Sequence, residues 1–134
     1  MRLGVSRVVR SAGVVLLGAV AVGAAGGGPG AAHPAPRRGV TAAHVLPPAQ
    51  VPRTPGALEA YEAARRVPRV LDGLYCYCHC SQTFGHRPLL TCFESEHASG
   101  CDICMGEARL AQKLASQQTS LAAIRRAIDA QFGS

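Results

Sequence analysis

Three cysteines at alternate positions, with a histidine among them, constrain this sequence more than any other feature. They form the run Tyr75-Cys76-Tyr77-Cys78-His79-Cys80, and the remaining cysteines of the chain are Cys92, Cys101 and Cys104. In an extended segment, side chains alternate between two faces. The three thiols of the run would then share one face, opposite His79. Every thiol of the chain therefore belongs to one short region, around which the rest must fold.

The sequence around the cysteines predicts a small all-α domain of about three helices around a cysteine-rich loop. We expect this domain over residues 55–134, with helices over residues 55–67, 101–116 and 120–132. Cys104 begins a stripe of small residues that should face the core of the second helix. The core is thin, because the chain has three Phe and no Trp. Domains of this size usually need disulfides or a metal ion for stability.

The N-terminal sequence has the three parts of an export signal. A basic region ends at Arg10, an apolar region runs from Ala12 to Ala25, and small residues suit cleavage. We therefore predict a signal peptide over residues 1–25 and export to a periplasm, a cell envelope or the extracellular space. An uncleaved membrane anchor is the alternative, although the apolar region is shorter than the ~20 residues that a spanning helix needs. Contact with a membrane is expected only in that case.

Residues 26–54 are rich in Pro, Gly and Ala. The repeated prolines prevent a continuous helix, and few apolar side chains are present to order the segment. We predict a disordered linker here. Two of its residues, His33 and His44, are expected to be bystanders rather than metal ligands.

The net charge of +6 does not indicate a nucleic-acid partner. Three basic residues, Arg2, Arg7 and Arg10, belong to the predicted signal peptide. The other arginines occur mainly in pairs, and no basic stripe with interleaved aromatic residues is present. We therefore expect no binding to nucleic acid.

Metal binding is the first of three functions that the cysteine pattern supports. Thiolates suit Cu(I) and Zn(II), and a pair three residues apart on a helix, opposite a loop of thiols, has the spacing of metal ligands. Sulfur atoms around one tetrahedral ion lie about 3.8 Å apart, whereas alternate residues of a flat strand lie about 6.6 Å apart. The run must bend around one ion or bridge several, which favours low-coordinate Cu(I) over Zn(II).

All six thiols are predicted metal ligands: Cys76, Cys78, Cys80, Cys92, Cys101 and Cys104. A second tier of candidates offers an imidazole nitrogen or a soft thioether sulfur close to the cysteines in sequence: His79, His86, His97 and Met105. Each of these could bind the ion or orient a residue that does.

A thiol redox function and a disulfide framework are the two alternatives. In a redox protein, Cys101 and Cys104 are the candidate catalytic residues, because a helix N-terminus favours the thiolate form of the first of them. In a structural domain, three disulfides would join each cysteine of the run to one of the other three cysteines. The expected partners are a soft metal ion and a redox or metal-transfer protein.

At these residues the chain resembles the exported bacterial proteins named for a Pro-Cys-Tyr-Cys-Gly-Cys motif, also called the CYCxC family. The resemblance covers about Leu58 to Phe132 and includes the cysteine run, Leu89-Leu90-Thr91-Cys92 and Cys101-Asp102-Ile103-Cys104. Tyr75 stands in place of the motif's proline and His79 in place of its glycine. Many relatives look like lipoproteins, but this chain lacks the lipid-bearing cysteine. The resemblance implies bacterial export, and since some members are described as selenoproteins, it also supports thiol redox chemistry. It does not assign an activity.

Overall fold

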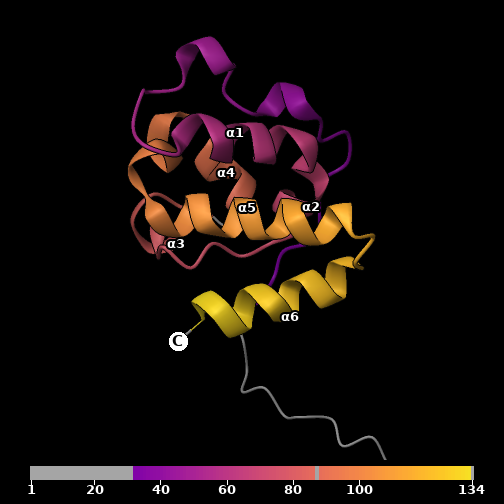
Figure 1. Ribbon diagram of the computed structural model, residues 1–134. Coiled ribbons are helices and arrows are strands. Elements are labelled where there is room, and N and C mark those ends of the chain that lie inside the picture. The colour runs from indigo at the N-terminus through magenta and orange to yellow at the C-terminus, as the bar shows by residue number, and fades with distance from the viewer. Residues whose placement is uncertain (1–31, 87, 134) are drawn as a thin grey trace, which may run out of the picture.

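The computed structural model describes residues 32–86 and 88–133, which form an all-α fold (Figure 1). Its α-helices and 3-10 helices (η) are η1 (Ala42–His44), η2 (Pro48–Gln50), α1 (Ala57–Arg66), α2 (Pro68–Asp72), α3 (Cys80–Thr83), α4 (Leu89–Phe93), η3 (Glu96–Gly100), α5 (Asp102–Ser116) and α6 (Leu121–Phe132). Within the described ranges, no helix is both long enough and apolar enough to span a membrane. The predicted signal peptide, residues 1–25, lies outside the described residues.

The three helices predicted from the sequence are present as α1, α5 and α6, which confirms the predicted fold class. Side chains cap the start of α5 and α6, at Cys101 and Ser120. α1 begins later than predicted, after Gly56. The reason is that the Thr54 hydroxyl donates a hydrogen bond to the Ser99 carbonyl instead of capping this helix.

The predicted cysteine-rich loop contains two short helices, α3 and α4, which the sequence did not indicate. A third short helix, α2, starts at Pro68 directly after α1. Proline ends one helix but is tolerated in the first turn of the next, where its missing N–H is not needed. These short helices place Cys80 and Cys92 at defined positions rather than on an irregular loop.

α5 lies between α1 and α6 and contacts both (Figure 1). The buried residues of the three helices include alanines on α1 and α5 and isoleucines on α6: Ala60, Ala64, Ala108, Ala111, Ile124 and Ile128. Small side chains let α1 and α5 approach closely. Tyr61 of α1 also meets Phe93 of α4 edge to face, with ring centroids 4.9 Å apart.

Residues 32–54 belong to the folded unit, so the prediction of a disordered linker over residues 26–54 is wrong for the part that the structure describes. Val40, Val45 and Val51 are buried, with only 5%, 1% and 8% of their surface exposed. η1 and η2 contact α1 on the side away from α6 (Figure 1). Prolines prevent a long helix here, but a chain of extended segments and short turns needs only occasional apolar residues to attach to a helical core.

Charged contacts attach the same segment to the elements that frame the cysteines. Arg37 lies 2.7 Å from a carboxylate oxygen of Asp72, at the end of α2, and 2.7 Å from one of Glu94, after α4. His33 Nε2 lies 2.8 Å from Asp129 Oδ1 on α6. His33 is therefore a structural residue, which joins the N-terminal segment to the last helix.

Candidate metal centre

The cysteine run is bent rather than extended. His79 adopts the left-handed backbone conformation, with φ of 62°, and α3 begins at the next residue. Cys76 Sγ lies 3.3 Å from Cys78 Sγ, about half the separation of alternate residues in a flat strand. The bend therefore turns the thiols of the run toward a common centre.

Two more thiols reach this centre from neighbouring helices. Cys92, on α4, places its Sγ 3.3 Å from that of Cys80. Cys104, in the first turn of α5, places its Sγ 3.5 Å from that of Cys76. All six cysteines lie within the described residues and are free, not joined by disulfides. Three separate segments thus supply five thiols to one cluster.

The cluster contains two sets of four donors, and within each set all ligand atoms lie within 4.8 Å of one another. The inner set is Cys76, Cys78, Cys92 and Cys104, of which all but Cys78 are buried. The outer set is Cys78, Cys80, Cys92 and His97, in which Cys78 and His97 are half-buried. Sulfur ligands of one tetrahedral ion lie about 3.8 Å apart. Either set can therefore hold a metal ion after small side-chain adjustments.

Cys101 is the one predicted thiol ligand outside both sets. Its Sγ accepts a hydrogen bond from the Cys104 N–H, at 3.4 Å, and so caps α5. Cys101 and Cys104 are the candidate redox pair of the sequence analysis. The structure gives them different positions, one thiol at a helix cap and the other inside the inner set.

The second-tier residues also differ in whether they belong to one of the two donor sets. His97 belongs to the outer set, whereas His86 Nδ1 lies 3.7 Å from Cys92 Sγ without being part of either set. His79 is exposed and belongs to neither set, and Met105 is buried in the core with 4% of its surface exposed. The rings of His86 and His97 contact each other at 5.1 Å between centroids, and both contact Phe84.

Glu107 is a residue at the centre that the sequence analysis did not select. It is fully buried, and its carboxylate accepts hydrogen bonds from the Cys76 thiol at 3.1 Å and from the Tyr77 N–H at 2.9 Å. Burial raises the pKa of Glu107 to about 7. A signal existed in the sequence, because Glu107 lies three residues after Cys104, on the same face of the predicted helix.

The thiols at the centre differ in their acidity. Burial raises the pKa of Cys78, but hydrogen bonds with Cys80, His97 and Cys76 outweigh this effect and lower it to about 6. Burial, followed by contact with Cys78, raises the pKa of Cys80 to about 11. The pKa values of Cys76, Cys92 and Cys104 are raised: hydrogen bonds among these thiols act in both directions, and desolvation adds to the rise. Cys78 is thus the most acidic thiol of the cluster, and a cation would favour the thiolate form of its neighbours as well.

Contacts on the opposite side hold the cysteine run in place. The Tyr77 hydroxyl donates to Asp129 Oδ1 at 2.6 Å, and His33 Nδ1 accepts a hydrogen bond from the Tyr75 N–H at 3.0 Å. The two tyrosine rings also meet edge to face at 5.1 Å. The run is therefore fixed both to α6 and to the N-terminal segment, which limits how far the thiols can move.

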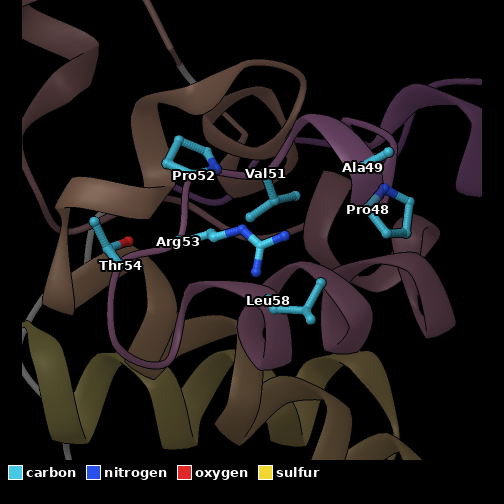
Figure 2. A pocket seen from close by; sticks show the side chains of 7 residues that line it. All are labelled: Pro48, Ala49, Val51, Pro52, Arg53, Thr54 and Leu58. Carbon is cyan, nitrogen blue, oxygen red and sulfur yellow. The ribbon is translucent and has the colours of Figure 1, made fainter.

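A surface pocket of about 320 Å³ lies elsewhere, between η2, the segment after it and the first turn of α1 (Figure 2). Its lining residues are Pro48, Ala49, Val51, Pro52, Arg53, Thr54 and Leu58. They include neither a thiol nor a histidine nor a carboxylate. This pocket has no part in the metal centre.

A family model described as "Protein of unknown function with PCYCGC motif" matches residues 37–134. No curated protein and no solved structure matches the chain significantly. The match begins at Arg37, inside the segment that the sequence analysis assigned to a linker. This agrees with the packing of that segment on the helices.

Proposed function

From the premise that the chain belongs to the PCYCGC-motif family, whose function is not established, we propose that it binds a soft metal ion through clustered thiolates. The observation that carries this proposal is the inner set, in which four thiols from three segments lie within 4.8 Å of one another. Three of the four thiols have raised pKa values and therefore stay protonated in the metal-free chain, so binding of a cation would draw off their protons and hold the resulting thiolates together.

Cu(I) and Zn(II) are the ions that fit these donors. Thiolate is a soft ligand that suits both, and tetrahedral sets of four sulfur donors are typical of Zn(II). Cu(I) also accepts fewer ligands and tolerates closely spaced sulfurs, so we propose that it binds more tightly than Zn(II). The N-terminal sequence supports export of the chain, in which case the ion is acquired or delivered outside the cytoplasm through a metal-transfer partner.

Elemental analysis of the full chain, purified without oxygen, tests the proposal. We expect bound copper or zinc, with the thiols of the inner set protected from alkylation until a chelator is added. The opposite result is a chain that stays metal-free after reconstitution and loses its thiols to intramolecular disulfides in air. That result would replace metal binding with the disulfide or redox alternative.

Two single substitutions make a matched pair for this experiment. Cys92→Ser removes a thiol that both sets use and should reduce metal binding strongly. Cys101→Ser removes a thiol that neither set uses, and serine is itself a good N-cap residue, so α5 should remain intact. Equal metal content in the two variants would exclude the cluster as the binding site.

A further inference from the structure

The inner and outer sets share two members, Cys78 and Cys92. We propose that the centre holds two metal ions, with these two thiolates as bridging ligands. This inference rests on the proposed function and extends it from a single ion to a binuclear centre. A thiolate sulfur carries several lone pairs and can bind two soft ions at once.

The number of donors fits two ions. The sets together contain six donor residues, and two four-coordinate ions that share two ligands require that number. Cys76 and Cys104 belong only to the inner set, whereas Cys80 and His97 belong only to the outer set. Each bridging thiol also lies close to a ligand that belongs to only one set. The Sγ atom of Cys78 lies 3.3 Å from that of Cys76 in the inner set, and the Sγ atom of Cys92 lies 3.3 Å from that of Cys80 in the outer set.

A single ion leaves this arrangement unexplained. An ion in the inner set would leave Cys80, with 3% of its surface exposed, and His97 as unused donors beside a group of buried thiolates. A second ion uses both and adds positive charge where the excess of thiolates lies. Burying unpaired charge is costly, so the second ion is favoured electrostatically.

The two positions differ in their access to solvent. Three of the four inner ligands are buried, whereas two of the four outer ligands are half-buried. His86 and Phe84 lie beside His97, and Phe84 is exposed over 62% of its surface. The outer ion should therefore be the first to leave when a chelator is added, and the inner ion the second.

Native mass spectrometry of the full chain, titrated with Zn(II) and separately with Cu(I) without oxygen, counts the ions. We expect two ions per chain at saturation and loss of one in His97→Gln. His79→Gly is the matched control, because His79 belongs to neither set, and it should keep two ions. Saturation at one ion would overturn the binuclear centre but keep the proposed function, whereas binding of none would overturn both.

Substitution with ¹¹³Cd tests the bridges in the unmodified chain, so the result does not depend on whether a variant folds. We expect two cadmium resonances that are split by coupling to each other, because a shared sulfur transmits this coupling. Two resonances without coupling would show two separate sites and overturn the role of Cys78 and Cys92 as bridges. A single resonance would overturn the second ion.

Discussion

His79 allows the cysteine run to bend, at a conformational cost. Its φ of 62° lies in the left-handed region, which a residue with a side chain adopts with strain and glycine adopts freely. The family motif has glycine at this position. The bend of the run therefore uses a backbone conformation that glycine adopts more easily than histidine.

We predict that His79→Gly raises the free energy of unfolding by about 1 kcal/mol, because the relief of strain exceeds the added freedom of the unfolded chain. Urea denaturation of the metal-free protein measures this change. Among the residues that the structure describes, Gln118 is the other non-glycine residue with positive φ, 60°, so Gln118→Gly is the control and should behave similarly. A loss of stability only at His79 would show that its imidazole makes contacts that support the bend.

Glu107 gives the metal-free protein a dependence on pH. Its pKa is raised by burial from 4.5 to about 7, so in the folded chain it stays protonated at pH values where the unfolded chain loses the proton. The folded state then binds more protons than the unfolded state, and stability falls as pH rises. The stabilising contribution is complete below about pH 4.5 and is lost by about pH 7.

We predict that this loss amounts to about 3 kcal/mol between these pH values and is absent in Glu107→Gln. Urea denaturation of the metal-free protein at a series of pH values measures it. Glu96→Gln, at an exposed glutamate of η3, is the control and should keep the slope of the parent protein. If the free energy of unfolding still falls with pH in Glu107→Gln, another group causes the effect.

Among the elements, the N-terminal segment has a larger role than its composition indicates. The side chain of Asp72 is completely buried, and Arg37 is its ionic partner across 35 positions of sequence. Hydrogen bonds to Asp72 and then Glu94 raise the pKa of Arg37. Without Arg37, Asp72 would be a buried carboxylate that keeps only the backbone N–H of residue 37.

We predict that Arg37→Met lowers the free energy of unfolding by about 2 kcal/mol, since an unpaired buried carboxylate is costly but Arg37 itself is half-exposed. Urea denaturation at neutral pH tests this. Arg38→Met changes the adjacent, exposed arginine and should have an effect within about 0.5 kcal/mol. Similar effects of the two changes would mean that Asp72 is stabilised mainly by other groups.

The elements that could be predicted from the sequence are those with local signals. α1 ends before Pro68, α5 and α6 begin at capping side chains, and all three helices have periodic apolar residues; the sequence predicted each of them. The packing of residues 32–54 had no such signal, because it depends on three separate valines and on Arg37 meeting two distant carboxylates. The helices α3 and α4 are too short to show a period.

The residues of the candidate site also divide into those with a local sequence signal and those without one. The sequence identified the thiols, because cysteine spacing is a local pattern. It did not separate Cys101 from the others, nor His97 from His79 and His86, because these differences depend on a bend and on the packing of α4, η3 and α5. Glu107 was visible only as one more polar residue on a helix, although its position relative to Cys104 placed it on the buried face.

For the whole molecule, an ion bound at the proposed metal centre would take the place of a larger core. The candidate donors come from the cysteine run, α4, η3 and α5, so a bound ion would connect elements that otherwise meet through few large side chains. A ligand that binds only the folded state stabilises it, by about 4 kcal/mol when its free concentration is a thousand times the dissociation constant.

We therefore predict that a chelator lowers the Tm of the loaded protein by several degrees, that Cys101→Ser keeps this difference, and that Cys92→Ser abolishes it. Calorimetry of loaded and chelator-treated samples without oxygen measures the three differences. Thiol oxidation would also change Tm, but a reductant rather than a chelator would reverse that change. A Tm that responds to reductant and not to chelator would mean that cysteine pairs such as Cys80 and Cys92, 3.3 Å apart, stabilise the domain as disulfides. A response to chelator that Cys92→Ser leaves intact would mean that the ion binds outside the cluster.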